Sequence, residues 1–237
     1  MQIPDHLYNE RYDDRYFDVV NALEESKHVF MRGNRIVERL AALPQGARRL
    51  VIGETGFGAG RNVLALMAHL TDSGVRDITI DYRSVDLHPL TPARIEAILQ
   101  GLEPGIRPLS TLLVAHYATL DMRGCGWRSM TFERPFGTLT VSLYIGEALA
   151  MVHSMPTPAD AWFLDGHAPK KNPDIWREEL LLAIGAATVT GGTVATYTAA
   201  GHVRRALNRA GFCVTRPAGT GGKKMMIAGV KLGENSG

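Results

Sequence analysis

Cysteine and long apolar runs are scarce in this sequence of 237 residues. The only two cysteines, Cys125 and Cys213, lie far apart and lack CxxC spacing, so we expect neither a disulfide framework nor a zinc site. This cysteine content is typical of a reducing compartment, and the cytoplasm is the expected location. No stretch approaches the roughly 18 uninterrupted apolar residues of a membrane span, and the polar N-terminus does not indicate secretion.

An excess of one charge is also missing, because the formal net charge at pH 7 is only +2. This value does not by itself predict binding to nucleic acid. Folding could still gather four basic pairs on one face, although such pairs are more often solvated surface: Arg48-Arg49, Lys170-Lys171, Arg204-Arg205 and Lys223-Lys224. With 45% hydrophobic and 21% charged residues, the composition permits a sizeable core.

Two parts of the chain differ in their residue pattern. Residues 1–45 are polar and irregular at first and then carry short apolar groups, which indicates an N-terminal arm or cap. Residues 46–237 alternate short apolar runs with longer amphipathic stretches, the order typical of a parallel α/β sheet. We therefore expect one α/β domain preceded by a short arm.

The same pattern predicts the individual elements. We expect strands at residues 50–52, 78–86, 139–145, 161–164, 193–197, 212–216 and 225–230. We expect helices at residues 62–70, 91–102, 172–187 and 201–210, with Thr91 as N-cap of the second and Gly211 just beyond the last. The predicted fold is Rossmann-like: a mostly parallel sheet flanked by helices, with the last two strands forming an antiparallel edge hairpin.

Glycine recurs four times within residues 53–60, between the first strand and the first helix. Glycine permits positive φ and close approach of the backbone to a ligand, and the helix start offers free N–H groups. A glycine-rich turn alone could equally cradle a dinucleotide pyrophosphate or be a tight connection. We predict cofactor contacts from this turn at Glu54, Gly56, Phe57 and Gly58.

Three carboxylates narrow the choice of cofactor. Glu54 within the turn would repel pyrophosphate but can pair with the ammonium of a cofactor that carries an amino acid, which favours S-adenosylmethionine over NAD. Asp86, at the end of the second strand, can accept hydrogen bonds from ribose hydroxyls, or it can be a turn aspartate. Glu147 follows the strand at 139–145 and could accept from an adenine amino group, or it can be a surface glutamate that starts a helix.

Asp165 is the candidate catalytic residue. It follows the apolar strand at 161–164 and therefore lies at the mouth of the predicted sheet. Methyl transfer is an in-line displacement by a neutral amine, so a carboxylate that accepts the amine N–H can orient its lone pair and take its proton. The alternative is an aspartate that caps a turn. His167 is left outside the predicted site because a lone loop histidine is more often structural, and no metal-ligand spacing is present.

These residues resemble the methyltransferase domain of the bacterial MnmC proteins, which complete a modified wobble uridine in certain tRNAs. The resemblance spans nearly the whole chain and rests on residues 54–58, 160–166, 168–173, 191–198, 201–205 and 210–212, with further matches at 13–17, 29–34 and 222–224. It implies a class I S-adenosylmethionine-dependent methyltransferase that converts 5-aminomethyl-(2-thio)uridine to its methylaminomethyl form. Asp165 corresponds to the family's acidic residue near the transferred methyl.

The resemblance also implies contact with the anticodon region of tRNA. We expect the arm and the basic pairs to contribute to it, and the candidate substrate-binding residues are Tyr16, Asn34, Lys171, Arg205 and Lys223. The sequence ends before a second glycine-rich unit that would bind flavin, so we expect a stand-alone methyltransferase without the family's FAD oxidase domain, and a monomer.

The sequence departs from the family pattern at His88, at His167 in place of a usual phenylalanine, and at Met225. These departures keep other interpretations open. One is a methyltransferase of the same fold that acts on a small-molecule or protein amine. Another is an NAD-dependent oxidoreductase or a nucleotide-binding regulator.

Overall fold

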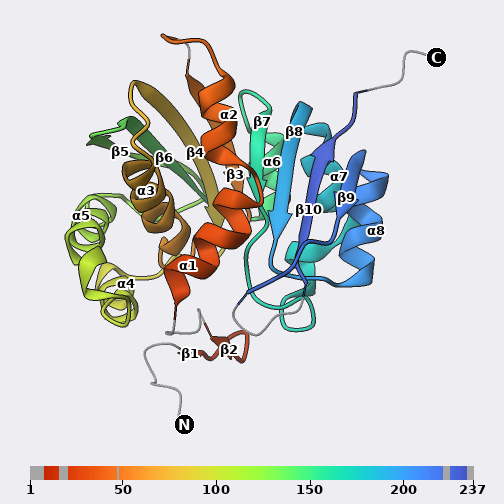
Figure 1. Ribbon diagram of the computed structural model, residues 1–237. Helices are drawn as coiled ribbons and strands as arrows, with labels where there is room; N and C mark the ends of the chain where they lie inside the picture. Colours follow the sequence, from red (N-terminus) through yellow and green to blue (C-terminus); the bar gives the residue numbers. More distant parts are fainter. Residues whose placement is uncertain (1–7, 16–20, 47, 221–224, 234–237) are drawn as a thin grey trace.

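The computed structural model describes residues 8–15, 21–46, 48–220 and 225–233. Their main feature is an eight-stranded sheet with the order β5-β6-β4-β3-β7-β8-β10-β9 (Figure 1). The strands are β3 (Arg49–Glu54), β4 (Ile78–Asp86), β5 (Gly126–Arg134), β6 (Gly137–Ile145), β7 (Ala159–Phe163), β8 (Thr188–Thr196), β9 (Phe212–Thr215) and β10 (Ile227–Lys231). The predicted α/β fold with a mostly parallel sheet is confirmed.

The order of the strands reverses beside β3. β3 pairs in parallel with both β4 and β7, and the parallel part of the sheet extends to β6 on one side and to β8 on the other. The chain runs from β3 outward to β4 and β6 and then returns to β7. Ligands of open α/β sheets bind at the carboxyl ends of the strands at such a reversal, which directs attention to the loops after β3, β4, β6 and β7.

Both edges of the sheet are antiparallel. β10 pairs antiparallel with β8 and with β9, which confirms the predicted C-terminal hairpin. At the other edge β5 pairs antiparallel with β6 from Gly126 to Arg134, a strand that the sequence did not predict. Only Met130 and Phe132 are buried on β5, so its apolar alternation is too short to be noticed.

Helices cover both faces of the sheet. One face carries α1 (Ala22–Ser26), the π-helix η2 (Lys27–Arg32), α2 (Ile36–Ala42), α3 (Arg61–Ser73), α4 (Pro92–Leu99), the short η3 (Pro104–Ile106) and α5 (Arg107–Tyr117). The other carries α6 (Ala148–His153), the short η4 (Pro173–Trp176), α7 (Glu178–Ala186) and α8 (Gly201–Arg209). The side chains of β3 alternate between these layers, because Leu50 and Ile52 join the first core cluster and Val51 joins the second.

Two helices differ from the sequence prediction. The helix expected at 172–187 is interrupted, because Arg177 adopts an extended backbone between η4 and α7. α5 was not predicted at all. By contrast, α4 begins as expected, with the Thr91 hydroxyl accepting a hydrogen bond from the Arg94 N–H. None of the described helices is both long and apolar enough to cross a membrane.

Much of the predicted N-terminal arm belongs to the core. Phe30, Met31 and Ile36 are at most 1% exposed and lie in the same cluster as β3 and α3. The ring of Phe30 stacks on that of Phe163 in β7, with 5.4 Å between the centroids. Residues 22–42 are therefore a layer of the fold that packs against the sheet (Figure 1).

Gly53 allows β3 to pack against a buried tryptophan. A Cβ atom at Gly53 would lie 2.5 Å from ring carbons of Trp162, which is fully buried and pairs with Gly53 across the two strands. We expect Gly53→Ala to lower the free energy of unfolding by about 1–3 kcal/mol through this overlap, measured by urea denaturation.

Gly105→Ala is the matched control, because no atom lies within 4 Å of a Cβ there. Its effect should stay within about 0.5 kcal/mol. Equal stability of the two variants would contradict the assigned overlap.

Candidate active site

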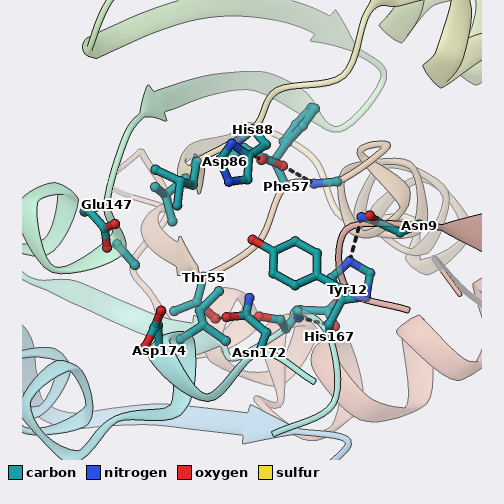
Figure 2. Close-up of a pocket in the computed structure, with 18 of the residues that line it drawn as sticks. Asn9, Tyr12, Thr55, Phe57, Asp86, His88, Glu147, His167, Asn172 and Asp174 are labelled. Atoms are coloured by element: carbon teal, nitrogen blue, oxygen red, sulfur yellow. Dashed lines mark hydrogen bonds between the residues drawn. The ribbon is translucent and has the colours of Figure 1, made fainter. Parts of the chain in front are cut away.

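A cavity of about 440 Å³ opens at the carboxyl ends of β3, β4, β6 and β7 (Figure 2). Its volume lies within the range of roughly 300–1,000 Å³ that is common for small-molecule sites. Of the predicted site residues, those that line it are Gly56, Phe57, Gly58, Asp86, Glu147 and Asp165. Four separate loops thus bring these residues to one place, at the reversal point of the sheet.

The glycine-rich turn lies under the cavity and leads into α3. Gly58 and Gly60 adopt positive φ, at 55° and 76°, a conformation that glycine permits. Gly56 has its α-carbon close to the next loop, since a Cβ there would lie 3.2 Å from the carbonyl oxygen of Asp165. The Phe57 ring is 3% exposed and stacks on Tyr117 at 5.7 Å, so it mainly anchors the turn in the core.

Asp86 ties the end of β4 to the glycine turn. Its Oδ2 accepts from the Gly58 N–H at 3.0 Å, and its Oδ1 accepts from the His88 N–H at 2.8 Å. Burial raises the pKa of Asp86, and the two N–H donors oppose this rise. Glu147, in contrast, is exposed at the rim of the cavity, where it precedes α6.

Glu54 does not face the cavity, which corrects the prediction that it binds the cofactor directly. It is 1% exposed, and its Oε1 accepts from Asn62 Nδ2 at 2.8 Å while its Oε2 accepts from the Ser84 hydroxyl at 2.6 Å. The physical reason is the alternation of β3, which puts Glu54 on the same face as Leu50 and Ile52, beneath α3. Burial raises the pKa of Glu54 to about 7.

Asn62 connects Glu54 to the site, a role that the sequence did not predict. Its amide nitrogen also donates to Asp165 Oδ2 at 2.7 Å, and its carbonyl oxygen accepts from the Ser26 hydroxyl at 2.7 Å. One side chain therefore joins α1, β3 and the loop after β7. The sequence feature that could have indicated this role is that Asn62 is a polar residue on the otherwise apolar, buried face of α3.

Polar contacts hold both the backbone and the side chain of Asp165 in place. Arg61 Nη2 lies 3.3 Å from its Oδ2, and the Gly166 N–H donates to its Oδ1 at 2.8 Å, while Thr55 donates to its carbonyl oxygen. A carboxylate has about four lone-pair positions, and Arg61, Asn62 and Gly166 account for three. One acceptor position of the carboxylate is therefore left over in a side chain that lines the cavity.

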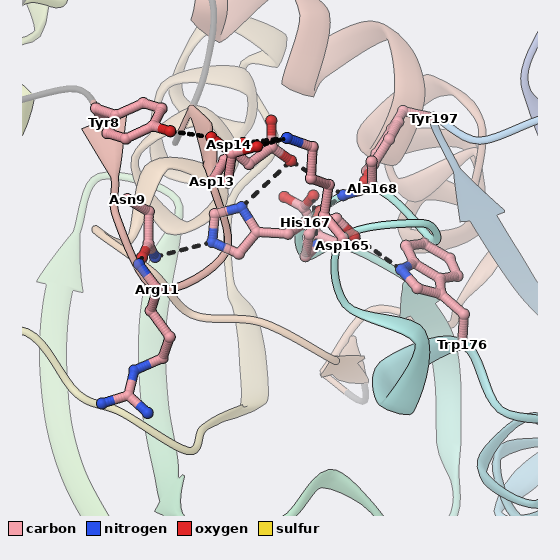
Figure 3. A network of polar contacts seen from close by, with 12 residues as sticks. Tyr8, Asn9, Arg11, Asp13, Asp14, Asp165, His167, Ala168, Trp176 and Tyr197 are labelled. Atoms are coloured by element: carbon pink, nitrogen blue, oxygen red, sulfur yellow. Dashed lines mark hydrogen bonds and ion pairs between the residues drawn. The ribbon is translucent and has the colours of Figure 1, made fainter.

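A hairpin of β1 (Tyr8–Asn9) and β2 (Asp14–Arg15) supplies residues that the sequence did not assign to the site. Asn9 and Tyr12 line the cavity, as does His167. Figure 3 shows the His167 ring, which comes from the loop after β7, directed toward Asn9 and Asp14 of the hairpin. His167 therefore belongs to the cavity wall, although the sequence argument left it out.

Asn34, a predicted substrate contact, lies in the core instead. It is 0% exposed, and its side-chain nitrogen donates to the carbonyl oxygens of Phe30 at 2.9 Å and Trp162 at 3.2 Å. These bonds attach the N-terminal helices to β7. Asn34 is therefore a structural residue, because a fully buried side chain cannot contact a substrate.

Among the other predicted substrate contacts, those that the structure describes do not line the cavity. Lys171 forms an ion pair with Asp13 of the hairpin near the cavity. Arg205 is exposed on α8 and does not line the cavity. Tyr16 and Lys223 lie outside the described residues. Within the described chain there is no cluster of three or more histidine, cysteine, aspartate or glutamate side chains suited to a metal ion.

The raised pKa of Glu54 makes stability depend on pH. Between its ordinary value of 4.5 and about 7, the folded protein keeps a proton that the unfolded chain has lost, so the free energy of unfolding falls as pH rises through this window. Glu54→Gln does not titrate. Between about pH 5 and pH 8 we therefore expect the variant to gain about 2–3 kcal/mol relative to wild type in urea denaturation.

Glu96→Gln, at an exposed position on α4, is the control and should follow wild type at every pH. A difference between Glu54→Gln and wild type that stays constant with pH would show that Glu54 does not hold this proton.

Comparison with known proteins identifies the family. The model of a family described as S-adenosyl-L-methionine-dependent methyltransferase matches residues 111–232. The chain is also 40% identical over 218 residues to the tRNA 5-methylaminomethyl-2-thiouridine biosynthesis bifunctional protein MnmC of Ectopseudomonas mendocina, and 39% identical over 222 residues to that of Pseudomonas fluorescens. These alignments cover 92% and 94% of this chain but 32% and 33% of the relatives, so the chain spans about a third of their length.

Solved structures agree with the fold. The crystal structure of MNMC2 from Aquifex aeolicus matches with a TM-score of 0.71 at 22% identity, covering 94% of this chain and 65% of that one. Spermidine synthase from Thermotoga maritima matches with a TM-score of 0.51 at 12% identity, covering 89% and 60%. The family match extends over about half of the chain and includes β7 and the Asp165 loop, so this protein belongs to the S-adenosyl-L-methionine-dependent methyltransferases.

Proposed function

We propose that this protein methylates the primary amine of 5-aminomethyl-(2-thio)uridine at the wobble position of tRNA, giving the 5-methylaminomethyl form. The observation that carries the amine chemistry is the Asp165 carboxylate, which lines the cavity and is held by Arg61, Asn62 and Gly166. The nature of the acceptor is supported by relatives at about 40% identity that are named for biosynthesis of this nucleoside in tRNA.

The cavity offers carboxylate acceptors to a cofactor. Its wall carries charges of both signs, from Asp86, Glu147, Asp165 and Asp174 and from Arg11, Arg61 and Arg177. In the proposed arrangement, Asp86 accepts from the ribose, Glu147 accepts from the adenine amino group, and Gly56 and Gly58 lie against the amino-acid part. When bound, S-adenosylmethionine supplies an electrophilic methyl group, whose C–S bond breaks with its electron pair moving to sulfur as the N–C bond forms.

Asp165 prepares the amine for this transfer. Its remaining lone pair accepts one N–H of the neutral amine, which turns the nitrogen lone pair toward the methyl donor. The nitrogen becomes positively charged on methylation, and Asp165 then accepts the proton that restores a neutral secondary amine. Arg61 and Asn62 keep the carboxylate in one orientation during both steps.

The proposed partner is tRNA, bound through its anticodon region in the cytoplasm. Lys171 lies beside the cavity, and Arg205 is exposed on α8. Cationic side chains such as these bind phosphates and make the affinity depend on salt. Asp13 neutralises part of the Lys171 charge, so its contribution to RNA binding is smaller than that of a free lysine.

The function is tested by the nucleoside content of tRNA. In cells that lack the gene, mass spectrometry should detect 5-aminomethyl-(2-thio)uridine in place of the methylated nucleoside. Purified protein with S-adenosylmethionine should convert that tRNA, and prior ribonuclease treatment should remove the activity. An unchanged nucleoside profile, or methylation that survives ribonuclease, would assign a different acceptor.

Asp165 and Glu147 should affect different kinetic constants. Asp165→Ala should lower kcat by roughly 10²- to 10⁴-fold, the range for loss of a general base, and leave the calorimetric affinity for S-adenosylhomocysteine near that of wild type. Glu147→Gln should weaken that affinity by about tenfold, as expected for loss of one charged hydrogen bond, with kcat retained at saturation. A large loss of cofactor affinity in Asp165→Ala would place this carboxylate in the cofactor site instead.

A further inference from the structure

The β1–β2 hairpin brings an aromatic ring into the cavity. Tyr12, at the tip of the hairpin, lines the cavity and is partly buried. Its ring stacks on that of His167, with 4.6 Å between the centroids and 29° between the planes. Figure 2 shows the Tyr12 ring projecting from the His167 side into the cavity, with its hydroxyl directed inward.

The polar contacts of His167 fix the orientation of this pair. Its Nε2 lies 3.0 Å from Asn9 Nδ2, and its Nδ1 lies 3.4 Å from Asp14 Oδ2 (Figure 3). Burial lowers the pKa of His167, which favours a neutral ring that donates from Nδ1 to Asp14 and accepts from Asn9 at Nε2. Both ring nitrogens are thus engaged with the hairpin.

Further bonds hold the hairpin in place. Asp14 Oδ2 also accepts from the Ala168 N–H at 3.2 Å, Arg94 donates to the Tyr8 carbonyl oxygen at 3.0 Å, and Lys171 pairs with Asp13. These contacts attach the hairpin to helix α4 and to the loop after β7. The Tyr12 ring is therefore positioned before a ligand enters.

We propose that the stacked Tyr12–His167 pair is the wall against which the planar pyrimidine ring of the acceptor stacks. This inference rests on the proposed function and deepens it. Proteins that bind unpaired bases commonly stack them on aromatic side chains, including tyrosine and histidine. His167 shares a loop with Asp165, and both line the same cavity, so a ring stacked there places its aminomethyl group near the carboxylate.

The surrounding charges agree with this assignment. Burial and the charge of Asp86 raise the pKa of Tyr12, so its phenol stays neutral at physiological pH. A neutral ring adds no negative charge beside Asp165 and Asp174, which line the same cavity. Asp86 ends β4 and Glu147 follows β6, whereas His167 follows β7, so the stacked pair and the predicted cofactor carboxylates come from different loops around the same cavity.

The test uses an anticodon stem-loop RNA that carries 5-aminomethyl-2-thiouridine. Tyr12→Leu should raise KM for this RNA, and its Kd in the presence of S-adenosylhomocysteine, by about 10- to 100-fold, the size expected for one lost stacked base. Tyr12→Phe keeps the ring and should stay close to wild type. Tyr8→Leu, the same change in the same hairpin but away from the cavity wall, is the matched control and should leave both constants nearly unchanged.

His167 variants separate stacking from positioning. His167→Ala removes the ring and should behave like Tyr12→Leu. His167→Phe loses the contacts to Asn9 and Asp14 but keeps a ring, and because the ring supplies the stacking surface this variant should recover most of the RNA affinity that His167→Ala loses. In all these variants the affinity for S-adenosylhomocysteine, measured without RNA, should stay close to that of wild type.

The outcomes distinguish the two proposals. Failure of wild-type protein to methylate the stem-loop overturns the proposed function. Methylation by wild type with equal KM and equal RNA affinity in Tyr12→Leu overturns the stacking assignment alone. A parallel loss of S-adenosylhomocysteine affinity in Tyr12→Leu also overturns it, because Tyr12 would then contact the cofactor.

Discussion

Two carboxylates, one fully buried and one at the cavity wall, share the single amide nitrogen of Asn62. Without this donor, Glu54 and Asp165 would face each other in a region of low dielectric, where like charges repel strongly. The amide nitrogen of Asn62 donates to both carboxylates, and the amide oxygen accepts a hydrogen bond from the Ser26 hydroxyl. The position of Asp165 therefore depends on helix α1, on strand β3 and on the start of α3 at the same time.

The packing of the N-terminal helices contributes to the position of Asp165. Ser26 reaches Asn62 only because α1 lies against α3, with Val29 and Phe30 buried beside it. Asn34 adds a second attachment, to the backbone of β7 just before the Asp165 loop. The segment that the sequence predicts to be an arm thus supports the Asp165 loop through Ser26 and Asn34, while the β1–β2 hairpin contacts the same loop through Asn9 and Asp14.

Local sequence pattern predicted the strands that carry the site, because buried parallel strands and the turns after them have clear periodicity and composition. It also placed Asp86 and Asp165 correctly at strand ends. The direction of Glu54 could have been predicted too, since period two puts it on the face of Leu50 and Ile52. The cavity positions of Tyr12 and His167 could not, because they depend on contacts such as the bond between Asn9 and His167, which are 158 positions apart.

That separation has a consequence for the order in which the molecule forms. Closing a loop of this length carries a large entropy loss, and contacts of high sequence separation form slowly. During synthesis the hairpin emerges first, but its partner His167 emerges only after β3, β4, β6 and β7 have been made. The part of the cavity lined by Tyr12 and His167 is therefore among the last to assemble, and a chain stopped short of the β7 loop has the glycine-rich turn but lacks His167, the partner of the hairpin.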